Sequence, residues 1–355
     1  MSETYAKQRA KELQILTREV LRELPGICFD FITAIDSTTQ PLTRYAYVND
    51  LKLFFGFLSD ELPKFGGRKP CEFEADDLGK VTSRDIHMYL DYLSLYYKDD
   101  VEITNDNLGK MRKLASLRSF YKFLYKNGYI DADPAALVDM PKRRQKEIIR
   151  LEIDEAARLL DYVETGEKLT ERQKKYNEHV RARDLAILTL FLGTGIRVSE
   201  LVGINIDDID FSINGFLVTR KGGNQSILYF PDEVADVLKD YLKLRMEQTP
   251  QAGHEDALFL SLQNKRISVR AVQNMVKKYA SQAAPLKKHL SPHKLRSTFG
   301  TNLYRETGDI YLVADVLGHS DVNTTRRHYA AMSEDRRRLA AKSVHLREND
   351  EEEPS

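Results

Sequence analysis

Apolar residues recur every three or four positions through much of residues 1–131, a spacing that is typical of amphipathic helices. The segments with the clearest spacing are 4–24, 41–61, 82–97 and 106–127. Capping or breaking residues mark several ends, with Thr82 or Ser83 before the third segment and Asn127-Gly128 after the fourth. We find no convincing strand pattern here. Residues 1–131 are therefore predicted to form a small α-helical bundle.

A basic stretch with prolines follows the bundle and includes Met140-Pro141-Lys142-Arg143-Arg144, so we interpret residues 132–148 as a linker. Beyond the linker, helical spacing returns at 153–163, 183–192, 231–246, 268–280, 293–307, 309–317, 321–330 and 333–345. The charged segment 167–178 is expected to be an exposed helix or loop.

A strand pattern occurs only in this second part of the chain. Residues 215–230 alternate around Gly222-Gly223, which predicts a β-hairpin, and 257–261 predict a short strand or extended piece. We therefore expect a mainly α protein of two domains, in which 149–345 form a mixed α+β domain with a small antiparallel sheet. Residues 346–355 form an acidic C-terminal tail.

Composition agrees with a folded protein of this size. A chain of 355 residues is long enough for two domains, and 42% hydrophobic with 30% charged residues is typical of soluble globular proteins. No apolar run approaches the roughly 18 residues of a membrane span, and the N-terminus is polar rather than signal-like, so we expect no membrane association. Cys28 and Cys71 form no CxxC pair, which fits a reducing cytoplasm and argues against structural zinc.

The net charge is zero, with 54 Lys+Arg against 54 Asp+Glu, so it neither supports nor excludes nucleic acid as a partner. Candidate chemistry is concentrated instead in residues 289–332, which contain His293, Arg296, His319 and Tyr329. Such residues suit a phosphodiester, because cationic and neutral donors bind its oxygens while a hydroxyl attacks phosphorus. Taken singly, each is more often a capping histidine, a surface arginine or a packed tyrosine.

Two further candidates lie upstream. Arg197, in GTGIRVSEL, directly follows a glycine-broken apolar helix that would hold its guanidinium in a fixed pose for a bidentate phosphate contact, and Glu200 would either orient it or cap an exposed face. Lys221, in TRKGGN, lies at the tip of the predicted hairpin. A lysine there can protonate a leaving oxygen if its pKa is lowered, and Arg220 is an alternative for that role.

Taken together, these residues occur in the order R…K…HxxR…LGH…Y, within the blocks GTGIRVSEL, TRKGGN, SPHKLRSTF and LGHSDVNTT. The arrangement resembles the tyrosine recombinases, the family of phage integrases and Xer-type enzymes, across the whole second domain. The 24 positions from Arg197 to Lys221 resemble the Xer branch, and the helical first domain resembles the family's core-binding domain.

The resemblance implies a role for each residue. Arg197 and Arg296 would clamp the phosphate, and Lys221 would be the general acid. His293 and His319 would form hydrogen bonds or handle protons, and Tyr329 would be the nucleophile. The sequence departs from the Xer pattern at two places. Ser297 stands where many Xer proteins have histidine, and Tyr329 follows His319 by ten residues rather than the usual nine.

By the same resemblance, the protein would be a site-specific recombinase that forms a 3′-phosphotyrosyl bond and a Holliday junction, without a cofactor, metal or ATP. Its partner would be a double-stranded DNA target, bound by a homotetramer in the cytoplasm, associated with the nucleoid. A second recombinase or activator, and a role in chromosome resolution or in mobile-element movement, stay open. The basic linker would lie along a phosphate backbone or be a solvated tether.

Three other functions remain open at this point. A type IB topoisomerase would use the same chemistry without a partner site. An inactive DNA-binding protein would keep the fold alone. A metal-dependent phosphodiesterase built on the two histidines is disfavoured, because no carboxylate accompanies them at ligand spacing.

Overall fold

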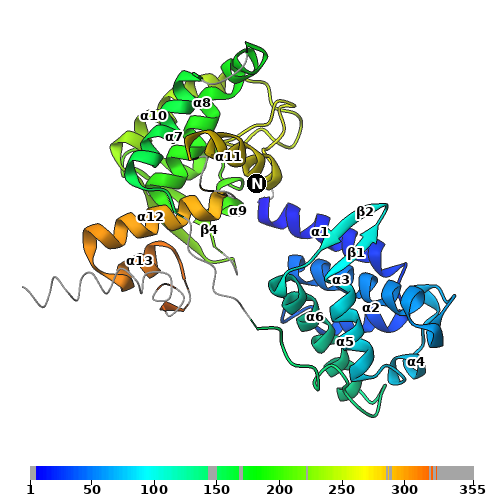
Figure 1. Cartoon of the computed structure of the whole chain (residues 1–355). Coiled ribbons are helices and arrows are strands. Elements are labelled where there is room, and N and C mark those ends of the chain that lie inside the picture. Colours follow the sequence, from blue (N-terminus) through cyan, green and yellow to red (C-terminus); the bar gives the residue numbers. More distant parts are fainter. Residues whose placement is uncertain are drawn as a thin grey trace, which may run out of the picture. The chain divides into compact units, whose positions relative to one another are not determined.

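The computed structural model divides the chain into two compact units, Met1–Lys146 and Glu147–Ser355 (Figure 1). The residues that it describes are 5–142, 150–167, 171–220, 223–284, 287, 290–319, 321, 322 and 325, without the side chains of 171–176. Lys221, Tyr329 and the predicted helix 333–345 lie outside the described residues, as does most of the predicted helix 321–330. Among the helices of the described ranges, none is long and apolar enough to span a membrane.

The first unit is a helical bundle with one small hairpin. Its elements are α1 (Tyr5–Leu21), α2 (Gly26–Ala34), α3 (Pro41–Glu61), α4 (Ala75–Gly79), α5 (Ser83–Tyr92), β1 (Leu95–Lys98), β2 (Val101–Thr104) and α6 (Asn107–Lys126), with 3-10 turns at Pro63–Phe65 and Pro70–Glu72. Helix α3 packs against α1, α2 and α6 and supplies much of the core. Aromatic rings fill this core edge to face, as between Phe31 and Phe120, whose ring centroids are 5.3 Å apart.

The predicted absence of strands in this unit is wrong. The helix predicted over 82–97 ends at Tyr92, and β1 then pairs antiparallel with β2, with Lys98 opposite Val101. Asp99 and Asp100 form the two-residue turn with φ of 51° and 59°, the left-handed conformation that such tight hairpins require. The sequence pattern also does not single out α2, which starts directly after Pro25.

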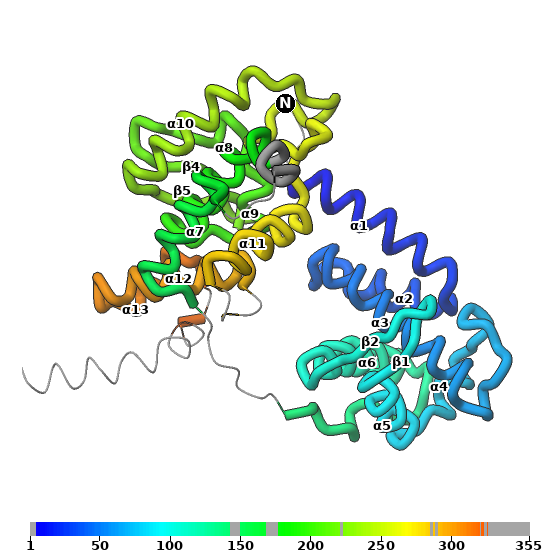
Figure 2. Tube along the Cα trace, turned by 45° about the horizontal axis from the view of Figure 1, so that its top comes forward, coloured from blue at the N-terminus to red at the C-terminus, as the bar shows by residue number. Residues whose placement is uncertain are grey.

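The second unit is built around one long helix, α8 (Glu171–Thr194), which other helices of the unit cover. Its elements are α7 (Ile153–Thr165), α8 (Glu171–Thr194), α9 (Val198–Leu201), a 3-10 turn (Ile206–Asp208), β3 (Ile209–Asp210), β4 (Gly215–Thr219), β5 (Gln225–Tyr229), α10 (Asp232–Met246), α11 (Val269–Ala283), α12 (Pro292–Thr307) and α13 (Ile310–Val316). Helix α8 packs against α7, α10 and α12 (Figure 2). The strands form an antiparallel sheet in the order β3-β4-β5. The expectation of a mainly α fold with a small antiparallel sheet is confirmed.

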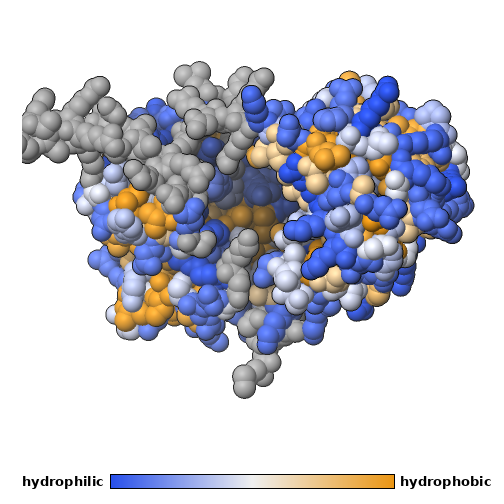
Figure 3. Space-filling view, turned by 90° about the horizontal axis from the view of Figure 1, so that it is seen from below, coloured by the Kyte–Doolittle hydropathy of each residue, from blue (hydrophilic) through white to orange (hydrophobic). Residues whose placement is uncertain are grey.

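The charged segment 167–178 differs in part from its predicted exposure. Helix α8 begins at Glu171, and the side chain of Asn177 is buried, where it accepts a hydrogen bond from Tyr279 at 2.7 Å. Periodicity misses this contact because Tyr279 lies 102 residues further along the chain. Outside such buried sites the surface is mixed, with groups of hydrophobic residues among hydrophilic ones on the face of each unit in Figure 3.

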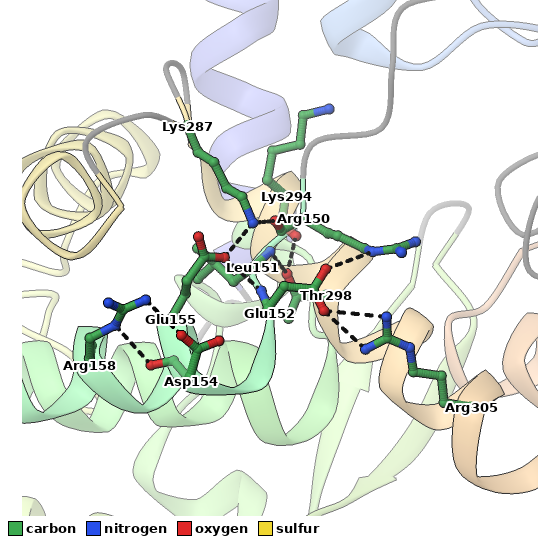
Figure 4. Close-up of polar contacts among 10 residues, drawn as sticks. All are labelled: Arg150, Leu151, Glu152, Asp154, Glu155, Arg158, Lys287, Lys294, Thr298 and Arg305. Carbon is green, nitrogen blue, oxygen red and sulfur yellow. Dashed lines mark hydrogen bonds and ion pairs between the residues drawn. The ribbon is translucent and has the colours of Figure 1, made fainter.

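A polar seam fastens the start of α7 to α12 (Figure 4). The backbone N–H of buried Leu151 donates to the Thr298 hydroxyl at 2.9 Å, and Arg305 contacts Glu152 at 3.3 Å. Lys287 donates to the Arg150 carbonyl at 2.8 Å. Residues 150–152 are thereby attached to the helix that carries His293 and Arg296.

Replacing Thr298 by valine tests this seam. Valine preserves the shape but leaves the buried Leu151 N–H without its acceptor, so the free energy of unfolding should fall by about 1–3 kcal/mol. Thr165→Val is the matched control, because the exposed Thr165 hydroxyl bonds only to the Asp161 carbonyl within its own helix, and it should change stability by about 0.5 kcal/mol or less. If denaturant titrations show equal losses of unfolding free energy for the two variants, the stabilising role of the seam is contradicted.

Candidate active site

Arg197 lies at the junction of α8 and α9, where the chain turns sharply. Gly195 makes this turn with φ +60°, and a Cβ there would lie 2.4 Å from the Phe299 ring, so only glycine fits without displacement. Arg197 then caps α9, and its backbone N–H donates to the Glu200 carboxylate at 3.0 Å.

The Arg197 side chain has two fixed contacts. Its guanidinium donates to Glu200 at 2.8 Å and to the Gly318 carbonyl at 2.6 Å. Glu200 is nearly enclosed, with 3% of its side chain exposed, whereas Arg197 is 31% exposed. Of the two roles left open for Glu200, the geometry supports orientation of Arg197.

Arg296 reaches the same region from α12. Its guanidinium donates to the Gly195 carbonyl at 2.6 Å and also to the Leu317 carbonyl, and the residue is only 5% exposed. Arg296 therefore connects the turn before Arg197 with the end of α13. A cation at these carbonyls is favoured, because the C-terminal end of a helix carries partial negative charge.

His319 follows the turn that ends α13. Gly318 adopts φ +58°, and the His319 backbone N–H returns to the Ala314 carbonyl at 2.9 Å, which closes the helix. Its imidazole is half-buried, and Nδ1 lies 2.7 Å from the Thr325 hydroxyl. The sequence carries no signal for this Thr325 contact apart from the position of Thr325 within the LGHSDVNTT block.

His293 lies in the first turn of α12, one turn before Arg296, as the HxxR spacing predicts. Pro292 occupies the first position of the helix, where its missing N–H costs nothing. The His293 side chain is exposed, and its backbone carbonyl accepts from the Ser297 hydroxyl at 3.0 Å. Ser297 thus makes a contact within its own helix.

Arg220 also reaches this site, in a position that the sequence pattern does not predict. Its side chain is 13% exposed and donates to the Ser226 hydroxyl at 2.8 Å and to the Val316 carbonyl at 3.0 Å. Glu200 lies 3.7 Å away. Burial lowers the pKa of Arg220, and the Glu200 charge opposes that shift. No local motif predicts these contacts.

The structure brings three of the six predicted residues to one turn. Arg197, Arg296 and His319 meet around the backbone of residues 317–319, and His293 shares α12 with Arg296. Helices α12 and α13 pack together at one end of the unit (Figure 1). Among the residues with described positions, no three His, Cys, Asp or Glu side chains cluster as metal ligands would.

Comparison with known proteins supports the resemblance read from the motifs. The phage integrase family matches residues 149–336. Tyrosine recombinase XerC of Caldanaerobacter subterraneus subsp. tengcongensis is 36% identical over 331 residues, which cover 90% of this chain and 86% of that protein. Tyrosine recombinase XerC of Chlorobaculum tepidum is 32% identical over 90% of this chain and 94% of its own.

Solved structures share the fold at low identity. The XerH site-specific recombinase bound to a palindromic difH substrate is 18% identical, with a TM-score of 0.59 over 85% of this chain and 78% of that chain. A lambda integrase dimer bound to a COC′ core site is 15% identical, with a TM-score of 0.58 over 84% and 95%. The family match and the curated relatives together identify the chain as a member of the phage integrase family, a tyrosine-type site-specific DNA recombinase of the Xer-like branch.

Proposed function

We propose that this recombinase cuts and rejoins its DNA with Tyr329 as the nucleophile and Lys221 as the general acid. Arg197 and Arg296 stabilise the charge on the reacting phosphate, and His293 and His319 form hydrogen bonds or handle protons. The observation that carries the proposal is the meeting of Arg197, Arg296 and His319 at the end of α13. The two guanidinium groups are held by backbone carbonyls, and the His319 imidazole is held by its contact with the Thr325 hydroxyl. Donors fixed in this way are preorganised, as stabilisation of a developing oxyanion requires.

In the cleavage step, a bond forms between the Tyr329 phenolic oxygen and phosphorus while the bond from phosphorus to the 5′-oxygen breaks. The electron pair of that bond leaves with the 5′-oxygen, which takes a proton from Lys221. The phenol loses its proton as it attacks, with the neighbouring imidazoles available to handle it. A 5′-hydroxyl of a partner strand then reverses the step, and the ester bond conserves the energy, so no ATP is consumed.

Support for Lys221 over Arg220 comes from the contacts of Arg220. The Arg220 guanidinium is largely enclosed and directed at Ser226 and two carbonyls of the α13 end. An arginine also retains its proton under nearly all conditions, which makes it a poor proton donor. Lys221 is the next residue in the chain and the better candidate.

The chain's substrate is DNA, and we place its parts on that substrate as follows. Residues 1–131 form a DNA-clamping domain, 132–148 a basic linker, 149–345 the catalytic domain and 346–355 an acidic tail. Four protomers act on paired sites in the cytoplasm at the nucleoid. The DNA-bound structures of XerH and lambda integrase, which share the fold, support the DNA-binding part of this arrangement.

Covalent trapping tests the nucleophile. Wild type, Tyr329→Phe and Tyr311→Phe would be mixed with fragmented host DNA in EDTA, denatured, and the protein-linked DNA sequenced. Wild type should form an adduct at a defined sequence, and Tyr329→Phe should form none. Tyr311→Phe should match wild type, because Tyr311 on α13 is 71% exposed and is assigned no role in the reaction.

An adduct with Tyr329→Phe would contradict the assigned nucleophile. No adduct with wild type, even after addition of host extract that supplies a missing partner, would contradict the chemistry. Adducts at random sequences, with relaxation of plasmids that lack a specific site, would favour a topoisomerase.

Deletion of residues 333–355 tests the role of the C-terminal segment. Ser333 is a candidate N-cap, and the segment that follows, with Leu339, Ala340 and Val344, has an amphipathic pattern, so we expect it to dock on a neighbouring protomer. The truncated protein should bind a single site with nearly unchanged affinity but lose synapsis and strand exchange between two sites. Undiminished recombination would contradict this role.

A further inference from the structure

The end of the β4-β5 hairpin is closed by the backbone of Arg220. The Arg220 N–H donates to the Asn224 carbonyl at 2.7 Å, and the Gly223 N–H donates to the Arg220 carbonyl at 3.1 Å. Arg220 is therefore the last paired residue before the loop, and Lys221 is covalently the next residue. Whatever fixes Arg220 also limits where Lys221 can be.

The side chain of Arg220 links this end of the hairpin to the end of α13. The guanidinium donates to the Val316 carbonyl at 3.0 Å and to the Leu317 carbonyl at 3.3 Å, and Nε donates to Ser226 on β5 at 2.8 Å. Residues Arg220 and Val316 are 96 positions apart in sequence. One planar side chain thus joins both strands of the hairpin to the helix end that precedes His319.

The helix end is shaped to receive this guanidinium. At Gly318, a Cβ would lie 2.7 Å from one terminal nitrogen of Arg220 and 2.8 Å from its Cζ, so any side chain there would displace Arg220. The chain itself satisfies the carbonyls of Ala314 and Asp315 through the N–H groups of His319 and Gly318. The carbonyls of the next three residues are satisfied by arginines instead.

Charge supports the same arrangement. Glu200 lies 2.8 Å from Arg197 and 3.7 Å from Arg220, and only 3% of its side chain is exposed. One enclosed carboxylate therefore lies between the arginine assigned to the phosphate and the arginine that holds the hairpin. The two arginines cannot move independently without separating one of them from this carboxylate.

We propose that Arg220 is a positioning residue that holds the β4-β5 hairpin against the α13 turn and thereby places Lys221 at the leaving 5′-oxygen. This inference rests on the proposed role of Lys221 as general acid. It goes further because it assigns a positioning role to Arg220, which takes no direct part in the reaction. Arg220 touches neither the phosphate nor the leaving group and acts only through its neighbour.

A substrate whose leaving group needs no proton distinguishes positioning of the general acid from a merely structural role of Arg220. The substrate is a duplex of the sequence recovered by trapping, made with the scissile 5′-oxygen either normal or replaced by sulfur. A thiol has a pKa of about 8.5, so the thiolate leaves near neutral pH without an acid. The readout is the ratio of the two rates of covalent adduct formation, which does not depend on the folded fraction.

Four proteins are compared, namely wild type, Lys221→Ala, Arg220→Gln and Arg245→Gln. Lys221→Ala should lose about 100-fold or more on the oxygen substrate, and Arg220→Gln about 10- to 100-fold, with both returning to within about threefold of wild type on the sulfur substrate. Arg245 is the matched control, because it is buried and donates to the carbonyls of Ala257 and Glu255, neither of which is assigned a role in the reaction. Arg245→Gln should keep the wild-type ratio.

Each outcome decides the inference. A larger sulfur-to-oxygen ratio for Arg220→Gln than for Arg245→Gln supports it. An equal loss of rate by Arg220→Gln on both substrates, or no loss on either, overturns the inference. If the sulfur substrate restores the rate of Lys221→Ala in the same experiment, the proposed function remains intact. If sulfur fails to rescue Lys221→Ala, Lys221 is not the acid, and the proposed role and this inference fall together.

Discussion

The site depends on the way in which the C-terminal end of α13 satisfies its backbone carbonyls. A helix end leaves carbonyls without intrahelical donors, and here three arginines from distant parts of the chain supply them. Arg197 comes from the α8-α9 turn, Arg220 from the hairpin and Arg296 from α12. The three segments that carry candidate chemistry therefore contact one turn, which fixes their positions relative to one another. The residue after that turn is His319.

Two glycines make this convergence possible for different reasons. Gly195 provides the turn before Arg197 and leaves room for the Phe299 ring, while its carbonyl accepts from Arg296. Gly318 ends α13 in the left-handed conformation and leaves room for Arg220. Glu200 then balances two of the three cations inside the protein. Positive charge is thereby concentrated at the proposed phosphate site, and the backbone carbonyls keep it fixed in advance.

Sequence patterns predicted the local part of this arrangement. The HxxR spacing placed His293 and Arg296 on α12, and the glycine-broken apolar helix placed Arg197 at a turn, because both depend on residues close in the chain. The contacts of Arg220 with residues 316 and 317 depend on packing between segments almost a hundred residues apart, which no local pattern encodes. The β1-β2 hairpin was missed for another reason, since the helical spacing of 82–97 continues beyond Tyr92, where α5 ends, and into β1.

Comparison of two glycine substitutions tests the central role of this turn most directly. Gly318 and Gly253 both lie in the second unit with positive φ, +58° and +83°, so alanine at either costs about 1–2 kcal/mol of backbone strain. Only at Gly318 does the added Cβ meet a neighbour, the Arg220 guanidinium, whereas nothing lies within 4 Å at Gly253. At a temperature where both variants are folded, Gly318→Ala should form the covalent DNA adduct about tenfold or more slowly than Gly253→Ala. Equal rates for the two variants would contradict the account.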